Sequence, residues 1–173
     1  PSAEELYANG PHAGTQAFEI GNPDFRKETS NGGEISLNAT GNGWKLGASV
    51  HYSRFRNYIF ERQTGEIIDD LPVFQIDQAH ARYYGFELDG SAKLGQFGDF
   101  AINLDTVVDL VRARIRDEGP APRIPPLRIL SGLEAQSDRL TARIEGEWSD
   151  SQNRLAPFET ATESYFLLNG SVS

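Results

Sequence analysis

The chain has 173 residues, 25 acidic against 16 basic side chains, a formal net charge of −9, and neither Cys nor Met. This length is about one domain. The absence of Cys excludes metal or redox chemistry through thiols, the acidic balance argues against a nucleic-acid-binding surface, and no apolar run reaches the roughly 20 residues of a transmembrane helix.

The first 25 residues have no helical or strand period, and they are predicted to form an irregular loop. Gly21, Asn22 and Pro23 are turn-forming residues that would lead the chain out of this loop. We expect Glu28 to begin the first long strand.

Alternation of apolar and polar residues predicts a long strand in "GWKLGASVHYSRFRNYIF". One face of the stretch 44–53 would carry Trp44, Leu46, Ala48, Val50 and Tyr52, and the other Lys45, Gly47, Ser49, His51 and Ser53. A period of two is typical of a strand with one apolar and one polar face.

The same alternation recurs to the end of the chain, and no stretch has the apolar spacing of a helix. We therefore predict about seven strands and very little helix. The strands are expected near residues 27–40, 43–60, 74–93, 99–115, 126–137, 139–149 and 162–173. The acids on their polar faces, read either as solvated charges or as facing a wet lumen, are Glu34, Glu87, Asp89, Asp105, Asp109, Glu134, Glu145 and Glu147.

The predicted connections alternate between short and long. Those at 40–43, 94–99 and 136–138 are short and rich in turn residues, which indicates tight hairpins. Those at 61–73, 116–125 and 150–161 are long and polar. This layout indicates an all-β fold, an antiparallel up-and-down meander of about seven long strands forming a segment of a transmembrane β-barrel. Aromatic residues expected at the ends of its lipid-facing strands are Trp44, Tyr58, Phe60, Phe100 and Trp148.

The competing interpretation is a soluble binding or adhesive β-sandwich, for example one that binds carbohydrate. Its two apolar faces would meet inside, and Trp44 and Trp148 would serve as stacking platforms. A hydrolase is a third interpretation, but no catalytic triad is recognisable. We therefore predict neither enzymatic activity nor a cofactor.

Three separated motifs resemble the barrel signature of TonB-dependent outer-membrane receptors. They are "ELYANGPH…FEIGNPDFRKETSNGGEISL" from residue 5, "YYGFELDGSAKL" (83–94) and "PPLRILSGLE" (125–134). The resemblance implies that residues 1–173 are a single segment of a receptor barrel, with an extracellular-type loop over 1–25 and strands and loops over 26–173. The family's plug domain, TonB-contacting box and closing strands have no counterpart here, so we expect the sequence to be a cut piece, roughly the C-terminal third of a barrel without its end.

The resemblance also implies a function, namely an active-transport receptor for a scarce nutrient in the bacterial outer membrane. The nutrient would be an iron chelate, haem or a metal ion. Loops would capture it above a plug that blocks a roughly 22-stranded barrel, and TonB would pull on that plug. The implied partners are the transported ligand, the TonB complex through the missing plug, and outer-membrane lipid, but no nucleic acid.

His12 is the leading candidate for a metal ligand. Its "ANGPH" segment resembles a receptor subgroup that includes zinc and haem uptake proteins, and neutral imidazole binds Zn or Fe well. Glu19 and His80 are further candidate ligand-binding residues, whereas His51 is expected inside the lumen. The alternative is that His12 only hydrogen-bonds the backbone, and nothing in the sequence brings the three histidines together.

The alternation gives two structural expectations. The apolar set Trp44, Leu46, Val50, Ile102, Leu104, Leu140 and Ile144 should share one face, and His51, Asp105, Arg143 and Glu145 the other. An isolated segment would have unpaired edges and an exposed apolar face. We therefore expect it to self-associate, to depend on detergent, or to curl until Trp44, Ile102 and Ile144 are buried.

Overall fold

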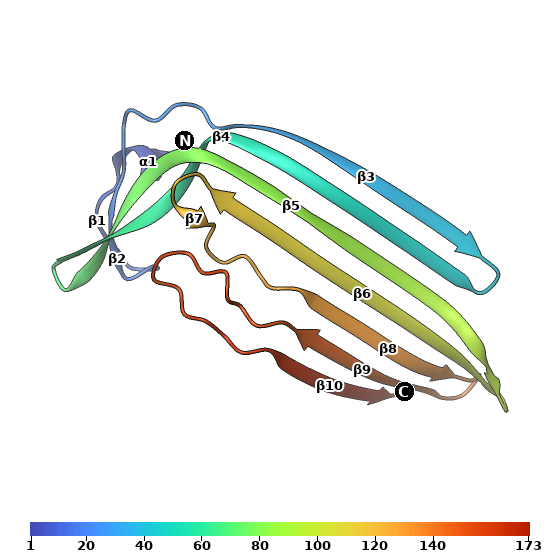
Figure 1. Cartoon of the computed structure of the whole chain (residues 1–173). Helices are drawn as coiled ribbons and strands as arrows, with labels where there is room; N and C mark the ends of the chain where they lie inside the picture. The colour runs from blue at the N-terminus through green and yellow to red at the C-terminus, as the bar shows by residue number, and fades with distance from the viewer.

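The computed structural model describes residues 1–173 as one open, curved β-sheet (Figure 1). All seven predicted long strands are present and pair antiparallel in chain order. They are β3 (Thr29–Gly41), β4 (Trp44–Ile68), β5 (Leu71–Phe97), β6 (Phe100–Ile115), β8 (Arg128–Gln136), β9 (Thr141–Ser149) and β10 (Tyr165–Val172). The predicted meander is confirmed, and β3 and β10 are the free edges of these seven strands.

The two ends of the sheet differ in the way that the sequence predicts, except at the connection from β4 to β5. Short turns join β3 to β4, β5 to β6 and β8 to β9 at one end, and the longer connections gather at the other (Figure 1). The connection from β6 to β8 contains the two-residue β7 (Gly119–Pro120), which pairs with the end of β6.

The strand register confirms the predicted faces, except for Leu140, which lies in the β8–β9 connection outside the strands. Residues directly opposite in a sheet point to the same side, and Trp44 lies opposite Ala92, Ala92 opposite Leu104, Leu104 opposite Leu133, and Leu133 opposite Ile144. These residues define what we call the apolar face. The rung Asp105–Gly132–Glu145 lies on the other side, which we call the polar face.

Almost nothing is buried in this sheet. Of 173 residues, 11 are buried, and the apolar face remains open, with Trp44 44% and Ile144 50% exposed. A β-sandwich needs a second sheet to cover such a face, and the structure contains one sheet. The sandwich interpretation is therefore wrong, and so is the idea that the sheet curls over its apolar face. Self-association of the isolated chain stays a prediction.

The predicted long loop over 61–73 is wrong. β4 and β5 continue through it and meet at a two-residue turn, Asp69–Asp70, where both φ angles are positive (51° and 61°). This is the backbone conformation that a type I′ hairpin requires. The alternation fails here because the pairing shifts register twice, between Phe55 and Tyr58 and between Gln63 and Ile67.

The first of these shifts also corrects the aromatic prediction. A bulge inserts an extra residue and reverses the facing of the residues after it, so Tyr58 and Phe60 lie on the polar face instead of the apolar face. The Tyr58 and Tyr83 hydroxyls are 2.6 Å apart, and Phe55 packs edge-on against both rings. On the apolar face, Tyr52 and Tyr84 form the aromatic pair at this end instead.

The opening segment is more regular than predicted. It forms the five-residue helix α1 (Ala3–Tyr7), closed by a capping box between Ser2 and Glu5, and a hairpin of β1 (Asn9–His12) and β2 (Ala17–Ile20). β2 adds to β5 by parallel pairing at residues 73–75. Elements of four or five residues complete too few periods to be recognised. No helix in the structure has the length and apolar character needed to cross a membrane.

Candidate functional site

Two predicted site residues meet in the β1–β2 hairpin. His12 pairs with Ala17 and Gly10 pairs with Glu19, so His12 and Glu19 are diagonal neighbours across the hairpin. His12 Nδ1 lies 3.0 Å from Glu19 Oε1. Thr15 in the turn donates its hydroxyl to the same carboxylate oxygen over 2.8 Å. The turn therefore holds the imidazole and the carboxylate in a defined arrangement.

This arrangement leaves one imidazole nitrogen free. An ionised carboxylate can only accept hydrogen bonds, so the Nδ1–H of His12 donates to Glu19, and Nε2 of the neutral ring keeps its lone pair. The His12 side chain is 52% exposed and that of Glu19 13% exposed. A carboxylate that orients a histidine through its second ring nitrogen is common behind metal-binding histidines. The hairpin can thus present a single nitrogen ligand to a metal.

The other two histidines do not join this pair. His80 is exposed on β5, on the same side as the apolar face, and lines a hollow beside Arg56 and Arg82. His51 lies opposite Gly85 and Glu34 on the polar face, as predicted. The chain contains no group of three or more His, Cys, Asp or Glu side chains arranged to hold a metal ion.

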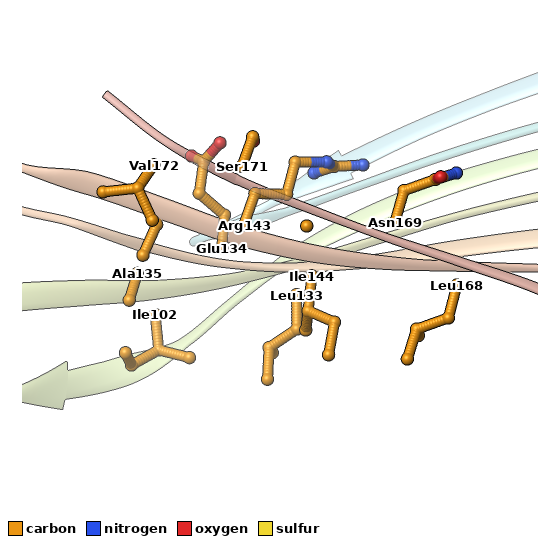
Figure 2. Close-up of a pocket in the computed structure, with 12 residues that line it drawn as sticks. Ile102, Leu133, Glu134, Ala135, Arg143, Ile144, Leu168, Asn169, Ser171 and Val172 are labelled. Atoms are coloured by element: carbon orange, nitrogen blue, oxygen red, sulfur yellow. The ribbon is translucent and has the colours of Figure 1, made fainter.

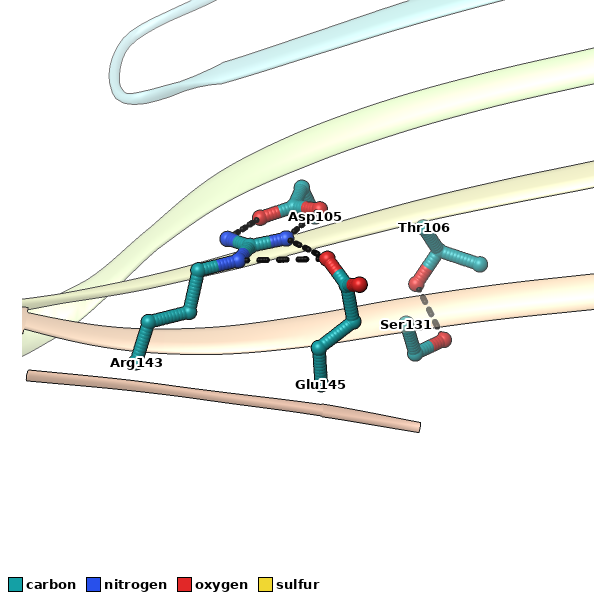
Figure 3. Close-up of polar contacts among 5 residues, drawn as sticks. All are labelled: Asp105, Thr106, Ser131, Arg143 and Glu145. Atoms are coloured by element: carbon teal, nitrogen blue, oxygen red, sulfur yellow. Dashed lines mark hydrogen bonds and ion pairs between the residues drawn. The ribbon is translucent and has the colours of Figure 1, made fainter. Parts of the chain in front are cut away.

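An ion-pair network crosses three strands of the polar face (Figure 3). Arg143 on β9 donates to both carboxylate oxygens of Asp105 on β6, over 2.6 and 2.8 Å. Its Nη2 also donates to Glu145 over 2.9 Å. The strand between them, β8, contributes Gly132 at this rung. Without a side chain there, the guanidinium reaches across β8 to Asp105.

The polar face is acidic between the short turns and the bulge in β4. All eight acids predicted for this face lie on it: Glu34, Glu87, Asp89, Asp105, Asp109, Glu134, Glu145 and Glu147. Its basic residues over the same stretch are Lys45, Lys93, Arg128 and Arg143. Arg143 is bound in the network, and Arg128 pairs with Asp109 over 2.8 Å. The remaining acids outnumber the lysines, so this face attracts cations.

A hollow of about 580 Å³ at the β8–β9–β10 end of the sheet is not a binding cavity (Figure 2). Leu133, Ile144 and Leu168 point to one side of the strands, whereas Arg143 and Asn169 point to the other. A single ligand cannot contact both sets across an intact sheet. The hollow is the open margin of the sheet beside its edge strand.

A model of a known protein family matches the entire chain. The family is described as "TonB dependent receptor-like, beta-barrel", and its match covers residues 1–173.

Three solved structures share the fold at low sequence identity. The "Copper transporter OprC" aligns with a TM-score of 0.81 and 19% identity over 98% of this chain. The FrpB iron transporter from Neisseria meningitidis (F3-3 variant) gives 0.63 and 13% over 92%. The siderophore receptor PirA from Pseudomonas aeruginosa gives 0.58 and 18% over 96%. The chain spans 27%, 26% and 30% of these three proteins, respectively.

Proposed function

The chain belongs to the β-barrel family of TonB-dependent receptors, and from that premise we propose that the whole protein imports a scarce nutrient. Members of the family are outer-membrane β-barrel transporters of Gram-negative bacteria, not enzymes. Within the transporter, this chain supplies part of the barrel wall and its external loops. The apolar face meets lipid, and the polar face lines the lumen.

One observation carries this proposal: the sheet leaves a continuous apolar face open while its other face is charged. In water such an apolar face would promote aggregation. In a barrel it contacts hydrocarbon, while the polar face contacts the wet lumen and the plug. The short turns then lie on the periplasmic side, and the long loops lie outside.

We further propose that the nutrient is a metal ion, an iron chelate or haem. The free Nε2 of His12 in an external loop and the acidic lumen wall both favour a ligand that carries a metal cation. The names of the similar structures, a copper transporter, an iron transporter and a siderophore receptor, point the same way. Uptake of copper, zinc, haem and ferric chelates by cells with and without the gene tests the proposal. If cells without the gene take up all four as well as cells with it, the proposal is contradicted.

His12→Ala in the full-length receptor is expected to weaken binding or uptake of the metal-bearing ligand at least several-fold, because it removes the imidazole ligand. Glu19→Gln should have a smaller effect in the same direction, since it loosens the ring without removing it. His80→Ala is the comparison variant, because His80 is an exposed histidine on β5 that takes no part in the contact between His12 and Glu19. Equal affinity of wild type and His12→Ala for all the ligands would leave His12 a structural loop residue.

The apolar face carries one polar pair whose behaviour tests its contact with lipid. Thr106 and Ser131 lie opposite each other, and their hydroxyls are 2.9 Å apart (Figure 3). Thr106→Val is expected to lower the free energy of unfolding in a bilayer by about 1–2 kcal/mol, because the Ser131 hydroxyl loses its partner in a medium without water. The double variant Thr106→Val/Ser131→Ala should lose less than the single variant. Strictly additive losses would show that the hydroxyls are not coupled.

A further inference from the structure

Guanidinium groups line up on the outer side of the wall, immediately above its apolar surface. The register places Arg54 on β4 opposite Arg82 on β5, and Arg82 opposite Arg114 on β6. The next rung below is Tyr52, Tyr84 and Arg112. Both rungs have the facing of the apolar surface and not that of the lumen. Three neighbouring strands thus present a row of positive charge at the level where the lipid-facing surface ends.

Two hollows extend this row. One, of about 200 Å³, is lined by Arg82, Arg112 and Arg114 together with Arg154 from the β9–β10 connection. A broader one beside it is lined by Arg54, Arg56, Arg82 and Arg114. Arg82 and Arg114 line both hollows. We call Arg54, Arg56, Arg82, Arg112, Arg114 and Arg154 the guanidinium cluster.

Arginines outnumber carboxylates around these hollows, because the one acid among the lining residues is Asp117, which lies 3.6 Å from Arg116. None of the six side chains of the cluster has an Asp or Glu oxygen within 4.0 Å, which is also true of the scattered Arg26, Arg123 and Arg139, whereas Arg62, Arg116, Arg128 and Arg143 are paired. The chain has an excess of acids, with a net charge of −9, so partners were available. Six like charges gathered around a single acid repel one another unless a further anion joins them. The cluster is therefore complementary to an anion supplied from outside the chain.

The position of the cluster identifies the class of anion. The cluster faces away from the lumen, on the side of the long loops, just above the tyrosines that mark the edge of the apolar surface. Lipid headgroups occupy this level. Arginine matches phosphate oxygens with two parallel N–H donors, and several arginines around one hollow suit a headgroup with more than one phosphate.

We propose that the guanidinium cluster binds the phosphates of an anionic lipid of the outer leaflet, one whose headgroup carries two or more phosphate groups. The site is separate from the path of the transported ligand, because the wall lies between them. The bound lipid fixes the height of the barrel in the membrane and closes the gap between the wall and the β9–β10 connection.

The test uses the full-length receptor in nanodiscs of zwitterionic phospholipid, titrated with a bisphosphorylated glycolipid. Arg82→Gln/Arg114→Gln is expected to weaken binding at least about tenfold. Arg123→Gln/Arg139→Gln, which removes the same charge outside the cluster, should leave binding unchanged. Equal losses in the two variants would reduce the effect to net charge and overturn the proposal, and so would no loss in either.

A second experiment uses only the wild-type receptor, so it tests the proposal even if the variants fail to fold. Wild-type receptor is titrated with the same glycolipid after enzymatic removal of its phosphates, which should weaken binding at least about tenfold. Inorganic phosphate at the same concentration should not displace the phosphorylated lipid. Equal affinity for the lipid with and without its phosphates would overturn the proposal. Displacement by free phosphate would also overturn it, because it would show a simple anion site instead of a lipid site.

Discussion

Ile144→Arg is expected to lower the free energy of unfolding of the receptor in a bilayer by about 2 kcal/mol, the penalty for a cation on the lipid face between the interface and the membrane centre. Ile144 lies in the middle of β9, level with Leu104 and Leu133, and half of its surface contacts no protein atom. In water an exposed arginine at such a position would change stability little. The penalty arises only because hydrocarbon replaces water on this face.

The matched control for this substitution is Asn103→Arg. Asn103 lies next to Leu104 on β6, opposite Glu134 on the polar face. An arginine there lies between Glu134 on β8 and Lys93 on β5 and contacts lumen water, so stability should change by less than about 1 kcal/mol. Urea unfolding of the receptor in lipid vesicles measures both variants. Equal losses, or no loss for Ile144→Arg, would contradict the assignment of lipid and lumen to the two faces.

Gly132→Ala is expected to destabilise the barrel by about 2 kcal/mol, although alanine normally suits a strand better than glycine. A Cβ at position 132 would overlap the guanidinium of Arg143, which crosses β8 at this point. The guanidinium would have to move away from Asp105, and the two-oxygen contact between them would be lost. Hydrogen bonds between charged groups contribute more than neutral ones, which sets the size of the expected loss.

Gly90→Ala is the control, because Gly90 also lies within a strand but a Cβ there meets its neighbours at 3.7 Å or more. It should be neutral or stabilising by about 0.5–1 kcal/mol. A double-mutant cycle with Arg143→Ala isolates the cause. Once Arg143 is gone, Gly132→Ala should cost almost nothing. A loss that persists in the Arg143→Ala background would show that backbone strain, not the network, is responsible.

The fold was predictable because alternation acts along each strand independently. Trp44 to Tyr52 and their polar neighbours need only a pleated backbone to separate into two faces. The prediction was wrong where the backbone departs from regular pleating. The bulge after Phe55 moved Tyr58 and Phe60 to the polar face, and the Asp69–Asp70 turn replaced a predicted loop.

The candidate site was predictable in part. His12 and Glu19 are seven residues apart, so a short hairpin suffices to join them, and the structure does so. His80 lies far along the chain on β5, with the facing of Arg82, and the sequence alone does not relate it to this hairpin. The guanidinium cluster was missed because its members come from three strands and a distant connection, and only the strand register brings them together.

By itself, the sequence determined the class of this protein: long two-faced strands, short turns at one end, and the motifs of a receptor barrel. Those features depend on contacts between residues close in the chain, or on the solvent preference of each side chain. Only the tertiary structure decided which charged side chains on different strands lie next to one another. It set Arg143 across Gly132 from Asp105, and Arg54 in line with Arg82 and Arg114. Such alignments depend on register between strands, which a single bulge changes and which no local pattern encodes.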